Sequence, residues 1–265
     1  MSKSIIRIAA IALAANLSSI ALAGTLVVSG DEWQISDSAY EPEYVAGTTA
    51  FVNSLATTFG GTNYLLLTGN AGIPQASLSK LAAQFTSLGK TVSYSATFSL
   101  ATASSYDAVF HVGQYIASPA DIAAYVNGGG GAYISLGSGQ YGNPVSEAAH
   151  WNPMLAQFGL VAGNTWFTDA GFVKATVVEG PTTSLLWGYG QTIEKLTPES
   201  SSVSYIRATF AGSQQVRGLV GASIEPKPPV VVPGVPEPAS WALMIAGFGV
   251  VGAVSRRRRL AFSRA

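Results

Sequence analysis

Polar side chains suited to catalysis or binding gather in three short segments, each directly after an apolar run. The first segment holds five acidic residues and no basic one: Asp31, Glu32, Asp37, Glu41 and Glu43. The second begins at His111, and the third surrounds Ser138. If the apolar runs are parallel strands, these segments meet at the sheet edge where ligands of open α/β sheets bind.

Hydrolysis is one chemistry that the segments suggest. Ser138 is the candidate nucleophile, His111 or His150 the candidate base, and Asp31 the accompanying acid. The sequence around Ser138 lacks a nucleophile elbow, because Leu136 stands where the first glycine is needed. His111 also lies within an apolar run, which favours a buried histidine. A hydrolase is therefore the alternative hypothesis, and we expect no enzymatic activity.

Two kinds of binding are also compatible with the segments. Asp31 and Asp37 are candidate calcium ligands, because calcium prefers carboxylate oxygens, but their spacing fits no EF-hand loop. Calcium is the one cofactor considered, and a solvated acidic loop is the simpler interpretation. Several aromatic residues are candidates for stacking on sugar rings, although their spacing is also that of ordinary core aromatics: Trp33, Tyr115, Tyr141, Trp166 and Trp187.

Composition and charge exclude several classes of function. The chain has no cysteine, so it has no disulfide, no thiolate metal site and no thiol nucleophile. Its net charge of zero hides an uneven distribution, because half of its basic residues lie near the two ends. Residues 24–230 carry thirteen acidic and seven basic side chains, a net charge of −6. A body this acidic lacks the basic surface that binds nucleic acid.

The elements that position these segments alternate between apolar runs and amphipathic stretches. We expect strands at residues 26–28, 64–67, 92–98, 108–112 and 132–136, and helices at residues 45–59, 77–88, 119–127 and 146–158. This alternation predicts an α/β fold with a doubly wound, mostly parallel sheet. Four later strands, at residues 172–178, 184–187, 203–210 and 216–222, are expected to be antiparallel and to lie at one edge of that sheet.

The body resembles a known superfamily in three places: Tyr-Asp-Ala-Val-Phe at residues 106–110, Tyr-Val-Asn at 125–127, and Leu-Gly-Ser-Gly at 136–139. This pattern is similar to the class I glutamine-amidotransferase-like superfamily. The resemblance implies a flavodoxin-like or amidotransferase-like sheet. An active member carries a cysteine after one strand, and this chain has none, so the resemblance implies no amidotransferase chemistry.

The first 23 residues have the pattern of a secretory signal peptide. Lys3 and Arg7 give the positive start, an apolar stretch follows, and Ala21 and Ala23 form an A-x-A cleavage site before Gly24. The expected partners are the secretion translocon and signal peptidase. The exported domain then covers residues 24–224.

The last forty residues have three parts in a fixed order. Residues 225–238 form a proline-rich linker, which favours an extended spacer. Residues 239–254 are apolar and would span only ~24 Å as a helix, less than the ~30 Å of a membrane core. The basic run Arg256, Arg257, Arg258 and Arg259 follows and holds its end in the cytoplasm. This order indicates a temporary transmembrane anchor.

Within this tail, Pro236, Glu237, Pro238 and Trp241 stand in the order Pro-Glu-Pro-x-x-Trp-Ala. Together with the apolar stretch and the arginines, residues 235–260 resemble the PEP-CTERM sorting signal. The resemblance implies cleavage by exosortase, a membrane enzyme of Gram-negative bacteria that make exopolysaccharide, the matrix of a biofilm. We therefore expect a secreted envelope or matrix protein, in transient contact with the inner membrane and with exopolysaccharide as a candidate partner. A hydrolase, or a module that binds glycan or calcium at the strand-end rim, is the alternative.

Overall fold

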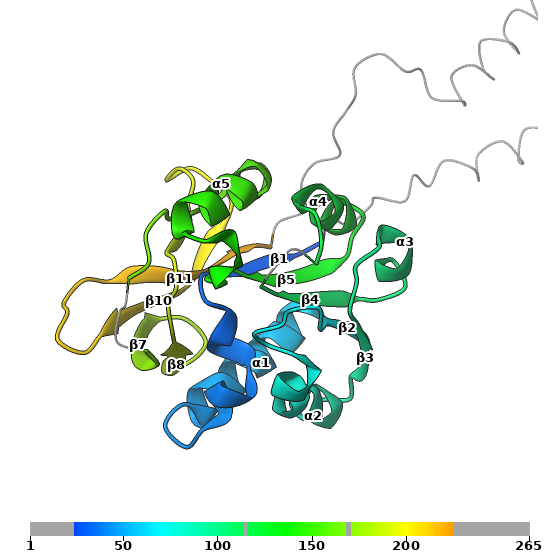
Figure 1. The fold of residues 1–265 in the computed structure, drawn as a ribbon, viewed down its shortest axis with the longest axis horizontal. Helices are drawn as coiled ribbons and strands as arrows, with labels where there is room; N and C mark the ends of the chain where they lie inside the picture. Colours follow the sequence, from blue (N-terminus) through cyan, green and yellow to red (C-terminus); the bar gives the residue numbers. More distant parts are fainter. Residues whose placement is uncertain (1–23, 114–115, 168–170, 225–265) are drawn as a thin grey trace, which may run out of the picture. The chain divides into compact units, whose positions relative to one another are not determined.

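The computed structural model describes residues 24–113, 116–167 and 171–224. Its main feature is a nine-stranded sheet with the order β3-β2-β4-β5-β1-β11-β10-β7-β8 (Figure 1). Five strands are parallel: β1 (Leu26–Ser29), β2 (Asn63–Leu67), β3 (Thr91–Ser95), β4 (Ala108–Val112) and β5 (Gly131–Ser135). The prediction of an α/β fold with a parallel sheet is confirmed.

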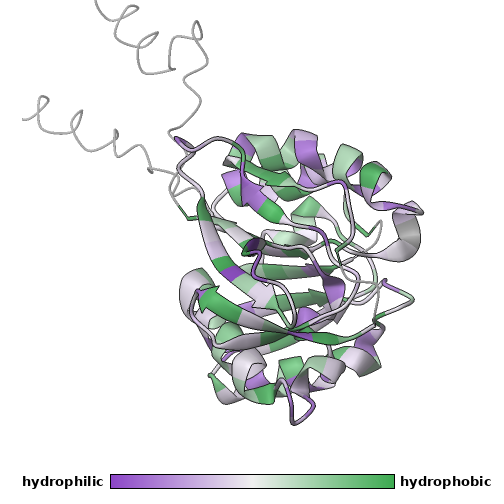
Figure 2. Ribbon diagram, turned by 90° about the vertical axis from the view of Figure 1, so that its left-hand side faces the viewer, coloured by the Kyte–Doolittle hydropathy of each residue, from purple (hydrophilic) through white to green (hydrophobic). Residues whose placement is uncertain are grey.

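Helices cover both faces of the parallel strands (Figure 1). One face carries α1 (Val45–Phe59) and α2 (Ser79–Ser87), which contribute Phe51, Leu55 and Phe85 to one core. The other face carries α3 (Leu100–Ala103), α4 (Pro119–Asn127) and α5 (Pro144–Leu155), whose core includes Val126 and Trp151. Turned by 90°, the sheet is seen between the two helical layers (Figure 2).

Local capping explains where α4 and α5 begin. The Ser118 hydroxyl accepts a hydrogen bond from the Asp121 amide at 3.1 Å, with proline at the first helical position, as expected from the sequence. The Asn143 side chain accepts one from the Ser146 amide at 2.8 Å, and Pro144 follows it. Helix α5 therefore starts two residues before the predicted position.

Four antiparallel strands continue the same sheet beyond β1. They are β11 (Arg217–Ser223), β10 (Val203–Phe210), β7 (Val173–Glu179) and β8 (Ser184–Trp187), in that spatial order. The predicted antiparallel strands at one edge are confirmed. A second sheet pairs β6 (Leu160–Ala162) with β9 (Ile193–Lys195), two short strands that were not predicted.

The strand order differs from the flavodoxin-like order that the amidotransferase resemblance implies. In the flavodoxin order the first strand lies between the second and third. Here β1 lies between β5 and β11, because the connection through α1 passes β5 and β4 before it enters β2. The register also places Leu26 opposite Ser223, so the first and last strands of the body begin and end at one edge.

No helix within residues 24–113, 116–167 and 171–224 is long and apolar enough to cross a membrane. The predicted signal peptide at residues 1–23, the proline-rich linker at 225–238 and the sorting tail with its apolar stretch lie outside the described residues. The sheet, its two helical layers and the loops at the strand ends are therefore what the structure offers for a functional site.

Candidate functional site

Two crevices open at the carboxyl edge of the parallel strands. Neighbouring strands β2 and β4 lead into helices on opposite faces, and so do β1 and β5. At such positions the following loops diverge and leave room for a ligand. The β2/β4 crevice and the β1/β5 crevice are therefore two of the places where the fold itself favours binding.

The β2/β4 crevice is filled by the side chain of Asn70. Its Nδ2 donates to Oε2 of Glu32 at 2.8 Å and to the carbonyl oxygen of Val112 at 2.7 Å. Its Oδ1 accepts from the amides of Gly72 at 2.7 Å and Ile73 at 3.1 Å. All hydrogen-bonding groups of this buried amide are satisfied within the protein.

Gly113, directly after β4, is required by the packing around Asn70. Its φ is +64°, a conformation that side chains rarely adopt. A Cβ at this position would also stand 2.8 Å from Nδ2 of Asn70 and within contact distance of the Glu32 carboxylate. The absence of a side chain thus lets Glu32 and Asn70 meet beneath the β4 loop.

Glu147, in the first turn of α5, organises the loop after β5. Its carboxylate accepts from the Gly137 amide at 3.0 Å, and from the amide and hydroxyl of Ser138 at 3.4 Å each. The side chain of Gln191, in the loop after β8, also donates to it. Glu147 is 1% exposed and therefore acts as an internal acceptor for two loops.

Asp31 joins the end of β1 to the loop after β8 in a similar way. One carboxylate oxygen accepts from the amide of Trp33 at 2.9 Å and caps the short helix η1 (Glu32–Ile35). The other oxygen accepts from the amide of Gly188. Asp31 is fully buried, so its carboxylate serves the structure of the rim and does not face solvent.

Burial raises the pKa of all three carboxyl groups. The pKa of Asp31 rises to about 6, and the pKa values of Glu32 and Glu147 each rise to about 7. Desolvation is the largest cause for each, because a buried charge loses its hydration. Hydrogen bonds, such as the one from Asn70 to Glu32, lower these pKa values, while the neighbouring carboxylates raise the values of Glu32 and Glu147 further.

A pocket of about 260 Å³ lies at the β1/β5 crevice, next to the carboxyl cluster. Glu32 and Trp33 line it from the end of β1, and Gly137 and Gly139 from the end of β5. Its remaining lining comes from loops of the antiparallel half, with Trp166 and Tyr189. The described lining of the pocket thus consists of one acidic residue, three aromatic residues and two glycines.

The aromatic rings around this pocket are accessible. Trp166 is 37% exposed and Tyr189 is 47% exposed, and their ring centroids are 6.5 Å apart. Trp33 packs edge-on against Phe172 at 5.1 Å, and Phe172 is itself 47% exposed. Large exposed aromatic side chains gathered at a concave site are typical of binding surfaces.

The hydrolase candidates from the sequence are only partly brought together. Asp31 and Ser138 lie at the carboxyl edge, and Ser138 donates its hydroxyl to Glu147. His111 is fully buried and packs against Trp151 with ring centroids 5.4 Å apart. Neither His111 nor Ser138 is among the described residues that line the pocket. His150, the other candidate base, lies between Trp151 and Tyr141.

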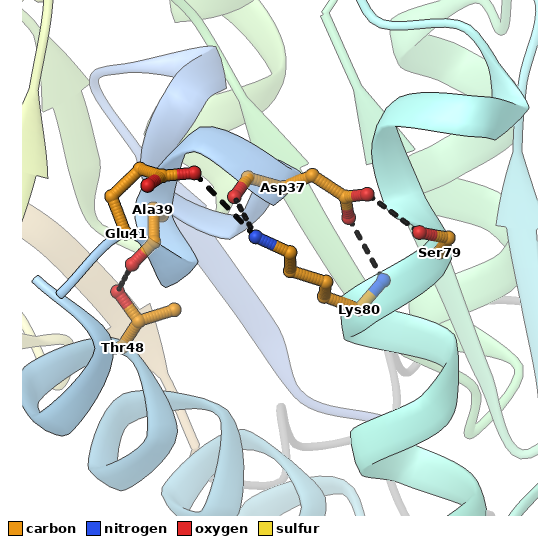
Figure 3. A network of polar contacts seen from close by, with 6 residues as sticks. All are labelled: Asp37, Ala39, Glu41, Thr48, Ser79 and Lys80. Carbon is orange, nitrogen blue, oxygen red and sulfur yellow. Dashed lines mark hydrogen bonds and ion pairs between the residues drawn. The ribbon is translucent and has the colours of Figure 1, made fainter.

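The acidic segment after β1 is divided between structural roles. The carboxylate of Asp37 accepts from the Ser79 hydroxyl at 2.6 Å and from the Lys80 amide at 2.8 Å, which anchors the start of α2 (Figure 3). The Lys80 ammonium lies 3.6 Å from Glu41. Within the described ranges, no three acidic or histidine side chains are close enough to hold a metal ion. Calcium binding by Asp31 and Asp37 stays a prediction.

Sequence reasoning missed several residues of the site. Glu147 was hidden inside a predicted helix, and Asn70 and Gln191 in loops whose partners are distant in the chain. Among the proposed sugar-stacking aromatics, Trp33 and Trp166 line the pocket, whereas Trp187 and Tyr141 are buried. Tyr115 lies outside the described residues. The glycines that flank Tyr189 were the available signal for an exposed loop aromatic.

A larger pocket, of about 450 Å³, lies at the opposite edge of the parallel strands. Its one carboxyl group among the described residues is that of Asp107, which accepts from the amides of Thr62 at 2.7 Å and Asn63 at 2.8 Å. These bonds lower the pKa of Asp107 and hold its carboxylate in the turn. We therefore place the candidate site at the smaller, aromatic pocket, where the fold's crevice and polar groups coincide.

Comparison with known proteins identifies the C-terminal segment. Residues 234–259 match the PEP-CTERM protein-sorting motif. The chain carries an exosortase sorting signal. The signal marks an exported protein that exosortase processes, and it implies transfer across the inner membrane to the cell surface or beyond.

No curated protein and no solved structure is recognisably similar to the chain. The resemblance of the body to the amidotransferase-like superfamily is therefore not confirmed. The PEP-CTERM match covers a small part of the chain and gives its destination. The activity of the body has to be argued from the pocket and the residues around it.

Proposed function

We propose that the protein is a surface or matrix component that binds a glycan in the pocket at the β1/β5 crevice without cleaving it. The observation that carries the proposal is the combination of Trp33, Trp166 and Tyr189 with the acidic residue Glu32 around one small cavity. The C–H faces of a sugar ring pack on aromatic rings, and a carboxylate accepts hydrogen bonds from its hydroxyl groups.

The distribution of carboxyl groups favours binding over hydrolysis. Glycoside hydrolysis uses two carboxyl groups on either side of the scissile bond. Of the three buried acids at this edge, only Glu32 lines the pocket, while Asp31 and Glu147 are engaged with backbone amides behind it. Among the described residues, Glu32 is the acid that lines the pocket. One such group is sufficient for recognition, whereas cleavage requires two.

Titration with neutral oligosaccharides, followed by tryptophan fluorescence, tests the glycan proposal. We expect saturable binding by the exported protein, purified with its tail in detergent. Trp166→Ala and Tyr189→Ala should each weaken binding about tenfold, the loss of one stacking contact. Tyr94→Ala is the matched control, because Tyr94 is 38% exposed on β3 and does not line this pocket. Equal losses in all three variants would contradict the proposal.

The route to the surface has its own test. Alanine replacement of Pro236, Glu237 and Pro238 should leave the tail uncleaved and the protein in the inner membrane of a host that has exosortase. Fractionation and intact mass measure both outcomes. Replacement of Pro228 and Pro229, which precede the matched residues, is the control and should be processed normally. Normal processing of the first variant would show that these three residues are not the processing signal.

A further inference from the structure

The polar groups beneath the pocket contain more hydrogen-bond acceptors than donors. Glu32 receives one side-chain hydrogen bond, from Asn70 to its Oε2. Gln191 is fully buried and gives its Nε2 to Glu147, and within the part of the chain that the structure describes its Oε1 has no hydrogen-bond partner. A buried acceptor without a donor costs about 1–3 kcal/mol. A ligand rich in donors would therefore suit this edge.

The described charged groups at the site are also unbalanced, because the acidic side chains are not matched by basic ones. Asp31, Glu32 and Glu147 place three carboxyl groups at one edge, and no basic side chain is among the causes that shift their pKa values. The described basic side chains with ion pairs interact elsewhere, Lys80 with Glu41 and Arg207 with Glu179. Ionised carboxyl groups in a partly dry site attract a positive charge strongly, because water screens it poorly there.

The aromatic residues of the pocket also suit a positively charged ligand. A cation is attracted to the face of a tryptophan or tyrosine ring when it lies within ~6 Å of the ring centroid. Trp166 and Tyr189, with centroids 6.5 Å apart, stand on the side of the pocket formed by the antiparallel half. Trp33 stands beside Glu32, on the side formed by β1. An ammonium group between these walls would meet aromatic rings and a carboxylate at once.

We infer that the pocket selects an amino sugar, a saccharide with a free ammonium group, which pairs with the Glu32 carboxylate between Trp33, Trp166 and Tyr189. This inference rests on the proposed glycan binding and adds the charge of the ligand to it. The ammonium group supplies both the donors and the positive charge that the described residues around the pocket lack. Acetylation of the nitrogen removes the charge and is therefore expected to weaken binding.

Titration of the exported protein with oligomers of glucosamine and of N-acetylglucosamine, equal in length and at neutral pH, tests the inference. We expect the free amine to bind at least tenfold more tightly in wild-type protein, which needs no variant to fold. Glu32→Gln keeps the shape and the oxygen that accepts from Asn70, and should remove this preference. Glu179→Gln, an exposed acid on β7, removes the same charge and should leave the preference intact.

The outcomes separate this inference from the glycan proposal. Equal affinity for the two oligomers, or tighter binding of the acetylated one, overturns the amino sugar and leaves glycan binding in place. Absence of binding by either oligomer and by neutral oligosaccharides overturns both. Loss of the preference in Glu179→Gln as well as in Glu32→Gln attributes it to overall charge and overturns the pocket assignment. Choline binding as tight as that of the glucosamine oligomer overturns the saccharide part.

Discussion

The two crevices at the carboxyl edge arise from the same topology, but one contains a protein side chain and the other contains a pocket. In the β2/β4 crevice, the Asn70 side chain is buried and uses all its hydrogen-bonding groups within the protein. In the β1/β5 crevice, residues of the loops after β1 and β5 line a pocket of about 260 Å³. Glu32 belongs to both, since it bonds to Asn70 and lines the pocket.

The difference shows how two equivalent positions of one topology can take different roles. A fully bonded amide stabilises the closed crevice and fixes the carboxyl group that the open crevice presents. The antiparallel half then adds Trp166 and Tyr189 to the open crevice alone. The four predictions below probe this division between a crevice that supports the fold and one that is available to a ligand.

The largest effect is expected from Asn70→Leu. Leucine is similar in volume but leaves the Glu32 carboxylate, the Val112 carbonyl group and two amides without their partner in a buried position. We expect a loss of about 4 kcal/mol in the free energy of unfolding. Thermal or urea unfolding measures it. Asn53→Leu, an exposed site on α1, is the control, and an equally small effect at both positions would contradict a supporting role for the closed crevice.

A smaller loss in the free energy of unfolding is expected from Gly30→Ala, just after β1. The new methyl group would collide with the carbonyl oxygen of Gln191, whose amide bonds to the Gly30 carbonyl at 2.8 Å. The loop after β8 would have to move away, which should lower the free energy of unfolding by about 3 kcal/mol. Ligand binding should also be lost, because Tyr189 moves with that loop. Unfolding and fluorescence titration measure the two effects. Gly139→Ala is the control for stability alone, since a Cβ there meets no protein atom but Gly139 lines the pocket.

The pH dependence of stability should come mainly from the buried carboxyl groups. Their pKa values are raised by folding, so between about pH 4.5 and pH 7 the folded state holds protons that the unfolded state has released. Stability is therefore fully present at low pH and falls as pH rises through this window. For Glu32 the loss between pH 5 and pH 8 should be about 2 kcal/mol. Urea unfolding across this range should show a flatter profile in Glu32→Gln, and an unchanged profile would contradict the raised pKa.

The smallest effect on stability is expected from Trp166→Ala. The ring is accessible and belongs to the open crevice, so its removal should change the free energy of unfolding by less than about 0.5 kcal/mol. The same variant should bind the ligand about tenfold more weakly. Its affinity would then change while its free energy of unfolding stays nearly the same. A loss of stability as large as that of Asn70→Leu would mean that Trp166 supports the fold and that the two crevices do not differ in role.

Much of the fold was predictable because local patterns determine it. Strands β4, β8 and β10 and helix α1 have the predicted bounds, since apolar runs, capping residues and glycines act within a few positions. The strand order was not predictable from those signals. Pairing of β1 with β5 and β11 depends on contacts between residues more than a hundred positions apart.

The site was less predictable than the fold for a related reason. Asp31, Glu32 and Ser138 were found because polar residues that follow apolar runs mark strand ends. His111 was correctly expected to be buried. The pairing of Glu32 with Asn70, and of Glu147 with Gln191, joins loops from four separate elements, and no spacing within the chain encodes it. The exposure of Tyr189 depends on the loop that carries it.

The pairing of Leu26 with Ser223 determines how the body can be displayed. Gly24 stands just before β1, and the signal peptide is expected to be removed there. Ile224 stands just after β11, and the sorting tail continues from it. Both residues are next to strand ends at the edge opposite the pocket. Segments that continue from either residue therefore leave the described body at the edge that does not carry the pocket. Cleavage before Gly24 or after Ile224 would remove no residue among those that line the pocket.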